Sequence, residues 1–334
     1  MRVLIALGGN AMTGPDGSAT PQAQRHAIAG AMEHVAQVVA AGHEVVLTHG
    51  NGPQVGNLLV KNELAAHVVP PVPLDWCGAQ TQGTIGFTIL DTLEAALARH
   101  GVRGRVAALV SRTLVDADDP GFRRPTKPIG RFLPREQAQV LVDHGETWED
   151  RGERGWRRVV ASPEPVEVLE TPTLLTLLED GYVVVAAGGG GIPVVRVEDG
   201  SVHGVEAVID KDLTAALLAR AVRCDVLVIA TDVDHAVVGW GTADERPLGV
   251  VPVAELERYA ADGEFASGSM GPKVEAALRF ARAGGTSVIT SLERITEAVS
   301  DPGAVGTTVS GETSAGTRHT EPPTPATESP RDGR

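Results

Sequence analysis

Two lysines stand where helices are expected to begin, a position that disfavours a cation. Lys211 follows the apolar run Val205 to Ile209, and apolar residues at helical spacing begin at Leu213. Asp212 is a suitable N-cap for that helix, because its carboxylate can accept from the free N–H groups of the first turn. Lys211 opposes the helix dipole there, unless an anion binds at the same point. It is either part of an anion site or a solvated surface side chain.

A second helix start repeats this arrangement. The stretch SGSMGPK, residues 267–273, precedes another apolar stripe, and Pro272 suits the first helical position, which puts Lys273 in the first turn. Lys127 stands between two prolines in PTKP, residues 125–128. Each lysine alone could be solvated, which is the usual state of this residue. The three together favour a site that binds a polyphosphate.

Glycine-rich turns follow three of the expected strands. They are Gly8-Gly9-Asn10, Gly50-Asn51-Gly52 and residues 188–191. Glycine permits a positive φ and lets a ligand approach the backbone. None of the turns matches GxxxxGK(S/T), and no GxGxxG follows a strand, so each alone could be only a tight turn. At one edge of a parallel sheet, however, the three turns would form a ligand-binding rim.

Strands and helices are expected to alternate along most of the chain. Strands are predicted at 3–7, 44–48, 105–110, 182–187, 226–230 and 287–290, with a last one near Thr307. Helices are predicted from the N-cap Thr20 to 41, at 74–100, 173–179 and 254–261, and from Pro272. A hairpin is expected at 193–203. This alternation predicts a parallel sheet with helices on both faces.

Two segments depart from the alternation. Residues 112–170 are rich in Pro, Arg, Asp and Glu, and their irregular stretches are too long for an ordinary connection, which indicates an inserted lid. Trp156 and the run Arg158 to Ala161 predict hairpin structure within it. Residues 312–334 consist mostly of Thr, Ser, Pro, Gly and charged residues, so we expect a disordered tail.

Composition excludes several classes of partner. The 334 residues are 42% hydrophobic, as in soluble globular proteins, and the net charge of −14 argues against nucleic acid or an anionic membrane. No apolar stretch is long enough to span a membrane, and the first apolar run is too short for a signal peptide. Cys77 and Cys224 match no metal or redox spacing, so we expect reduced cysteines in a cytoplasmic protein.

Several longer motifs resemble those of the carbamate kinases, a group with the amino acid kinase fold. The resemblance covers residues 1–309 and rests on IALGGNA, THGNGPQVG, PTKPIGRF, GWRRVVASPEPVEVLE, AAGGGGIPVV, GVEAVIDKDL, ATDVD and FASGSMGPKVEAA. It implies a three-layer αβα sandwich with an open, mostly parallel sheet and a protruding lid subdomain. It further implies a carbamate-binding lobe at 1–203 that includes the lid at about 112–170, an ATP-binding lobe at 204–311, and a homodimer.

The resemblance also implies an activity and the residues that perform it. The reaction would be reversible phosphoryl transfer between ATP and carbamate with Mg²⁺, used to make ATP in arginine or related catabolism. Phosphate handling and its orientation fall to Lys127, Lys211, Lys273 and Asp212. Substrate binding falls to Gly8, Gly9, Asn10, Gly50, Asn51 and Gly52. Nucleotide binding falls to Lys211, Asp232, Ser269, Met270 and Lys273. No metal ligand is identified, and Asp210 could bind metal or face solvent.

Some positions depart from the family pattern. Residues 235–241 replace the usual Val-Tyr and Asn-Phe-Gly run on the adenine side, where Trp240 could restore aromatic area, and Met12-Thr13-Gly14 replaces the usual Leu-Leu-Arg-Gly. Carbamate is already an anionic nucleophile and needs no strong base, so we interpret His49 as structural. Two alternatives stay open: another acid kinase or carbamoyl-phosphate-synthesising enzyme of this fold, and a silent nucleotide-binding regulator.

Overall fold

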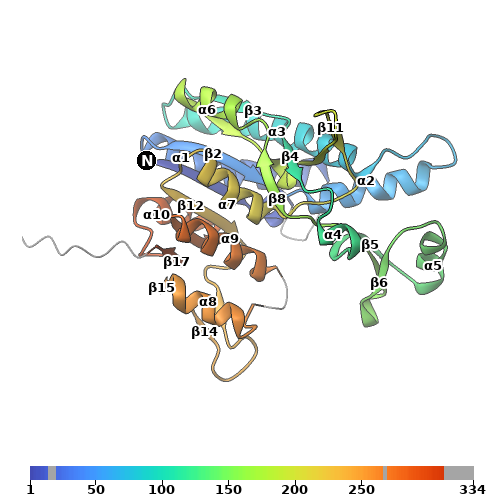
Figure 1. The fold of residues 1–334 in the computed structure, drawn as a ribbon. Coiled ribbons are helices and arrows are strands. Elements are labelled where there is room, and N and C mark those ends of the chain that lie inside the picture. Colours follow the sequence, from blue (N-terminus) through green and yellow to red (C-terminus); the bar gives the residue numbers. More distant parts are fainter. Residues whose placement is uncertain (14–19, 266–268, 312–334) are drawn as a thin grey trace, which may run out of the picture.

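The computed structural model describes residues 1–13, 20–265 and 269–311, and a large sheet runs through its centre (Figure 1). The eight strands of this sheet are β1 Arg2–Leu7, β2 Glu44–His49, β3 Arg105–Ala108, β9 Tyr182–Val185, β12 Val226–Thr231, β15 Val250–Pro252, β16 Thr286–Ser291 and β17 Thr307–Ser310. Their order across the sheet is β15-β17-β16-β12-β1-β2-β9-β3. The six strands from β16 to β3 are parallel, whereas β17 is antiparallel to β16.

Strand β1 lies inside the sheet and is buried on both faces. Val3, Ile5 and Leu7 face one core cluster, while Leu4 and Ala6 face the other. Alternation of this kind follows from the two-residue period of a strand. Burial on both sides explains why the sequence reads as an unbroken apolar run, as is typical of parallel sheets covered by helices.

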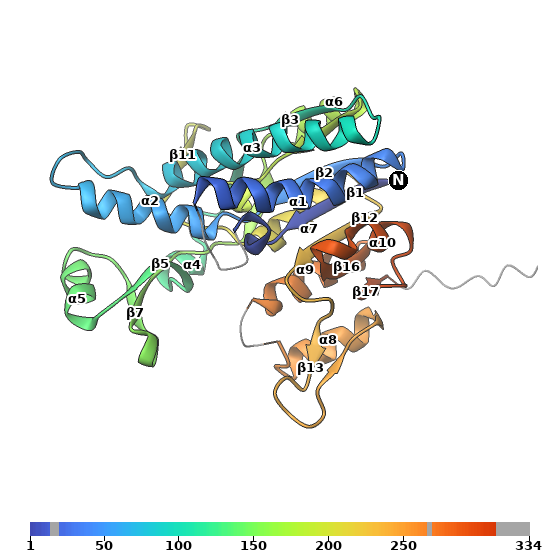
Figure 2. The same ribbon diagram turned by 180° about the vertical axis from the view of Figure 1, so that it is seen from behind.

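Helices cover both faces of the sheet. On one face lie α1 Pro21–Ala40, α3 Leu74–Arg99 and α10 Ile295–Ser300 (Figure 2). On the other lie α6 Thr171–Glu179, α7 Lys211–Ala221, α8 Val253–Ala261 and α9 Met270–Arg282 (Figure 1). The predicted three-layer αβα sandwich with its mostly parallel sheet is thereby confirmed.

Helix starts agree with the sequence prediction at α1 but not at α7 and α9. The Thr20 hydroxyl accepts from the N–H of Ala23, as expected of an N-cap. The N-cap of α7 is Asp210 rather than Asp212, since the helix begins at Lys211 and Asp212 lies inside its first turn. Helix α9 begins at Met270, so Pro272 is its third residue, not its first. Proline is tolerated there because the first four N–H groups of a helix have no partner within the helix.

A second sheet joins the two ends of the predicted lid segment to the main body. Its strands are β4 Arg112–Val115, β8 Pro165–Val168, β10 Ile192–Arg196 and β11 Val202–Gly204, in the order β11-β10-β4-β8. The antiparallel pair β10–β11 is the hairpin expected at 193–203. Only the part between β4 and β8 therefore projects from the body.

That projecting part, residues 120–160, is called the protruding subdomain here (Figures 1 and 2). It contains α4 Pro120–Arg123, β5 Lys127–Leu133, α5 Arg135–Asp143, β6 Trp148–Asp150 and β7 Trp156–Val160. The three strands form an antiparallel sheet, and Leu133, Ala138 and Trp148 pack in a small core of their own. At the base, Ile129 and Val160 pack against α3 and α2 Gly52–Ala65.

Short elements complete the fold: η1 Gly9–Met12, η2 Gly152–Arg154, η3 Gly188–Gly190, η4 Leu292–Arg294, β13 Val237–Val238 and β14 Arg246–Pro247. None of the described helices is long and apolar enough to cross a membrane. Cys77 and Cys224 are both free, as expected. The tail predicted at 312–334 lies outside the described residues.

Candidate active site

The predicted glycine turns meet at the carboxyl ends of β1, β2 and β9. A Cβ placed on Gly50 would lie 3.0 Å from the backbone nitrogen of Gly9, so the first two turns touch. A Cβ on Gly189 would lie 2.1 Å from Asn51 Nδ2, so the second and third turns touch as well. Gly189 also has a φ of +68°, which disfavours any larger residue. The backbone of Gly9 therefore crowds a side chain at Gly50, and the Asn51 side chain together with the positive φ disfavours one at Gly189.

Buried polar side chains hold the turn at 187–191 in place. Each donates a hydrogen bond to one of its carbonyl groups: Thr48 to Ala187 (2.9 Å), Gln82 to Gly188 (2.9 Å), and Thr113 and Thr214 to Gly190 (2.9 and 3.1 Å). None of these four residues is among the candidates predicted from the sequence. Gln82 could have been noticed, because it is the one amide side chain among the buried residues of α3.

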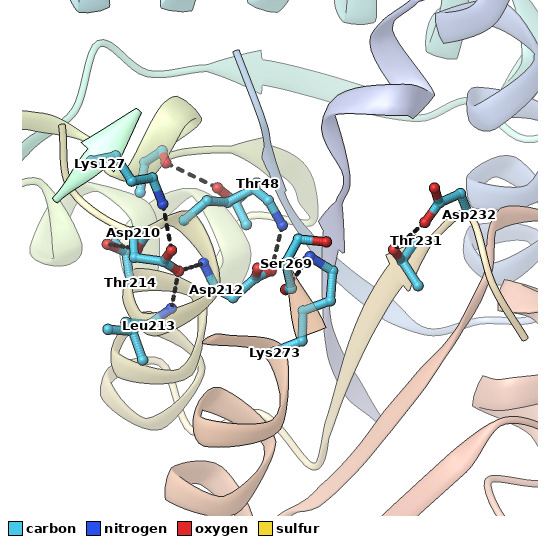
Figure 3. Close-up of polar contacts among 12 residues, drawn as sticks. Thr48, Lys127, Asp210, Asp212, Leu213, Thr214, Thr231, Asp232, Ser269 and Lys273 are labelled. Carbon is cyan, nitrogen blue, oxygen red and sulfur yellow. Dashed lines mark hydrogen bonds and ion pairs between the residues drawn. The ribbon is translucent and has the colours of Figure 1, made fainter. Parts of the chain in front are cut away.

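Asp212 contacts two of the predicted lysines, Lys211 and Lys273, and Figure 3 shows Asp212 beside Lys273. Lys211 Nζ donates to Asp212 Oδ1 at 2.5 Å, and Lys273 Nζ donates to Asp212 Oδ2 at 3.3 Å. Burial alone would raise the pKa of Asp212, but the charges of Lys211 and Lys273 and their hydrogen bonds outweigh it and hold this pKa below its usual range. Asp212 is therefore an anion that orients two ammonium groups at the starts of α7 and α9.

The third lysine reaches the same region from the protruding subdomain. Lys127 Nζ donates to Asp210 Oδ2 at 2.6 Å, and Asp210 is buried, so its carboxylate does not simply face solvent. The cluster of Lys127, Asp210, Lys211, Asp212 and Lys273 holds three ammonium groups and two carboxylates, a formal charge of +1. A locally positive cluster in a chain of net charge −14 is suited to an anionic ligand.

Lysine usage is a signal that the sequence analysis missed. The chain has 29 Lys and Arg residues, of which four are Lys and 25 are Arg. Three of the four lysines belong to the cluster, and the fourth, Lys61, is exposed on α2. Since arginine supplies nearly all the other basic residues, the gathering of three of the four lysines in one cluster indicates positions that suit a compact ammonium rather than a guanidinium.

Two cavities are lined by residues of the predicted site. One of about 200 Å³ is lined by Gly8, Gly9, Asp232, Ser269 and Lys273, among others. A second of about 390 Å³ lies beneath β5 and is lined by residues that include Asn51, Gly52 and Gly189. Five sequence-predicted site residues therefore line the smaller cavity, whereas Asn51 and Gly52 line the larger one. Lys273 belongs both to the smaller cavity and to the cluster.

Two predicted nucleotide residues differ in their surroundings. Ser269 is exposed, and its carbonyl accepts from Lys273 Nζ at 3.3 Å. Met270 packs against the core cluster of the α7–α9 face. Asn10 lies in η1. Residues 267 and 268 of the predicted motif lie outside the described residues. Trp240 is 67% exposed in the loop that departs from the family pattern.

His49 lies under the turns and is almost completely buried. Its Nδ1 is 2.9 Å from the carbonyl of Gly50, and a Cβ on Gly188 would overlap its ring. Burial lowers the pKa of His49 to about 4, against a smaller upward effect of the Gly50 hydrogen bond. The neutral ring packs between two glycine turns, which agrees with the interpretation that it is structural.

Comparison with known proteins identifies the class. The sequence model of the amino acid kinase family matches residues 1–291, so the chain belongs to that family. It is 46% identical over 313 residues to a carbamate kinase from Thermococcus kodakarensis, covering 92% of this chain and 98% of the other. Carbamate kinase 1 from Enterococcus faecium is 42% identical over 311 residues, with the same coverage.

Solved structures agree with the sequence relatives. Carbamate kinase from Giardia lamblia bound to AMP-PNP superposes with a TM-score of 0.86 at 40% identity, covering 93% of this chain and 98% of that one. Within the amino acid kinase family, this chain belongs with the carbamate kinases.

Proposed function

We propose that this protein is a carbamate kinase, which transfers a phosphoryl group reversibly between ATP and carbamate to give ADP and carbamoyl phosphate. The observation that supports this most directly is the cluster of three lysines and two aspartates at the carboxyl edge of the parallel sheet. The lysines are poised to neutralise transferring phosphate oxygens, and the relatives with the same fold along nearly the whole chain are carbamate kinases.

The reaction needs alignment and charge neutralisation more than acid or base chemistry. A carbamate oxygen attacks the γ-phosphorus of ATP and forms a new O–P bond. The bond from that phosphorus to the β,γ-bridging oxygen breaks, and its electron pair leaves with ADP. No proton has to move, because carbamate is already anionic. Ammonium groups fixed in advance stabilise the charge that spreads over the phosphoryl oxygens.

We assign the residues to roles on this basis. Lys127, Lys211 and Lys273 would contact the phosphoryl groups, with Asp212 orienting the last two. Carbamate would bind at Gly8, Gly9, Asn10, Gly50, Asn51 and Gly52. The nucleotide would contact Asp232, Ser269 and Met270 together with Lys211 and Lys273. The smaller cavity brings the turn after β1 together with Asp232, Ser269 and Lys273, which supports carbamate and nucleotide positions that adjoin each other.

Magnesium would enter this site with the nucleotide. Among residues 1–13, 20–265 and 269–311, no three His, Cys, Asp or Glu side chains are grouped to hold a metal ion. This fits Mg²⁺, which binds mainly through substrate phosphates, waters and one or two carboxylates rather than in a protein cage. When bound, it would neutralise charge on the phosphates. Asp232, which lines the smaller cavity, is the carboxylate best placed to approach it.

The remaining expectations belong to the same proposal. Residues 1–203 would form the carbamate lobe and 204–311 the ATP lobe, in a cytoplasmic enzyme that makes ATP from carbamoyl phosphate in arginine or related catabolism. The protein would be a homodimer. The exposed Trp76, Phe87 and Val110, at 60%, 58% and 61%, offer apolar surface for a partner copy.

A substrate panel tests the activity against its alternatives. Purified protein with Mg²⁺ and ATP should phosphorylate carbamate, formed from ammonium and bicarbonate, and should show no comparable rate with acetylglutamate, aspartate or UMP. A preference for any of these three would identify a different kinase of the same fold. No turnover with any of the four would favour a silent nucleotide-binding regulator.

A further inference from the structure

We propose that Asp210 is a positioning residue that ties the protruding subdomain to the start of α7 and holds Lys127 ready at the phosphoryl site. The inference rests on the proposed function for its kinetic consequence, but the contact itself can be tested without activity. Two oxygens of one carboxylate carry two separate tasks, and ordinary N-caps perform only one of them.

The first task is to fix the first turn of α7. Asp210 Oδ1 accepts from the backbone N–H of Asp212 at 2.9 Å and of Leu213 at 3.3 Å. The Asp210 backbone is extended (φ −71°, ψ 123°), as is usual for an N-cap. Because Lys211 and Asp212 are the first two residues of this helix, the cap sets the place from which both side chains reach the site.

The second task is to hold Lys127. Asp210 Oδ2 accepts from Lys127 Nζ at 2.6 Å, and the side chains are 12% and 33% exposed. A pair this sheltered is screened by salt less than a surface pair. Lys127 is the first residue of β5, 83 positions away in the sequence. Its long side chain would otherwise have to be ordered when the phosphate binds, at a cost in side-chain conformational entropy.

The backbone joins the same two segments next to this ion pair. Ala161, directly after β7, pairs with Ala207, and the N–H of Val208 donates to the carbonyl of Ala161 at 2.9 Å. The base of the protruding subdomain is therefore attached to the segment that ends in Asp210. The Lys127–Asp210 ion pair adds a side-chain contact between the same two segments at the phosphoryl site (Figure 3). The Asp210 carboxylate therefore positions both the protruding subdomain and the start of α7.

Substitutions can separate the two tasks. Asn and Ser are both good N-caps and keep an oxygen for the N–H groups of α7, but neither offers a second anionic oxygen to Lys127. Asp210→Asn and Asp210→Ser should therefore fold normally and release Lys127. Asp210→Ala should lose the cap as well and have a lower Tm. Thr20→Ala is the matched control, because it removes the N-cap of α1, on the opposite face of the sheet from α7.

Labelling of amines in the ligand-free protein tests the contact. Wild type and variants would be treated with an amine-reactive ester, and labelling at each lysine followed by mass spectrometry. We expect Lys127 to be labelled several-fold faster in Asp210→Asn and Asp210→Ser, with Lys61 unchanged as the internal control. Unchanged labelling of Lys127 in both variants would overturn the proposal.

Kinetics test the consequence. In Asp210→Asn, kcat for ATP formation should fall about tenfold or more, since a misplaced catalytic group is costly, while the KM for ADP changes little and Thr20→Ala retains wild-type kcat. Wild-type kcat in Asp210→Asn and Asp210→Ser would show that Asp210 is only a cap. Wild-type protein without any kinase activity would instead contradict the proposed function and the kinetic part of this inference, and the labelling result would still decide the contact.

Discussion

Replacing Lys211 with Ala tests the charge cluster most sharply. The change removes the ammonium group closest to Asp212, at 2.5 Å, and reduces the formal charge of the cluster from +1 to 0. Asp212 keeps Lys273 at 3.3 Å, so it is not left as an unpaired buried charge. Truncations that do leave such a charge cost about 3–5 kcal/mol of stability, and this one should cost clearly less.

The effect on turnover should be far larger than the effect on folding. Removing one preorganised group that stabilises transition-state charge typically costs about 3 kcal/mol. Since each 1.36 kcal/mol is a factor of ten, kcat should fall on the order of 100-fold. The KM for the substrates should change less, because the charge spreads over the phosphoryl oxygens mainly in the transition state.

Steady-state kinetics in the ATP-forming direction, with the Tm measured on the same samples, would check this result. Lys61→Ala is the matched control, because Lys61 is the remaining lysine of the chain and is exposed. Its kcat should equal that of the wild type. A Lys211→Ala enzyme with the wild-type Tm and a kcat within about threefold of wild type would refute the assigned role of Lys211.

Two further predictions concern residues beneath the site. Because the pKa of His49 falls from 6.5 to about 4 on folding, the unfolded chain binds more protons between those values, and stability should decrease by roughly 3 kcal/mol as pH falls from 6.5 to 4. Urea unfolding at both pH values checks this, and an equal decrease in His49→Gln would contradict it. Gly189→Ala should lower the free energy of unfolding by about 1–3 kcal/mol, because φ is +68° and the new Cβ would overlap Asn51. Gly30 lies in helix α1 with no atom within 4 Å of a new Cβ, so Gly30→Ala should instead raise the free energy of unfolding by about 0.5–1 kcal/mol. Equal Tm values for the two variants would refute the crowding at Gly189.

The order of helices and parallel strands could be predicted because each element carries its own signal. Apolar runs such as Val3–Leu7 indicate strands buried on both faces, and Thr20 followed by Pro21 fixes a helix start. The start of α7 could not be placed, since Asp210 and Asp212 are equally good caps in isolation. In the folded chain Asp210 caps the helix and pairs with Lys127, whereas Asp212 pairs with Lys273, and the sequence does not specify these contacts between distant segments.

Contacts between distant segments were beyond the sequence signals. The second sheet pairs β4 with β10 and β8, and nothing in these short strands specifies their partners. The lysines were recognisable because a cation at a helix start is locally unfavourable. The hydroxyls of Thr48, Thr113 and Thr214 carry no comparable conflict, so their role became visible only when the turn at 187–191 was placed against them.

We expect the lysine cluster to support phosphoryl transfer between carbamoyl phosphate and ADP. The most direct measurement is a coupled assay that follows ATP formation from carbamoyl phosphate, ADP and Mg²⁺ with the purified wild-type protein. We predict ATP production that is proportional to enzyme concentration and requires all three components. Folded protein that produced no ATP above the spontaneous rate would contradict the account.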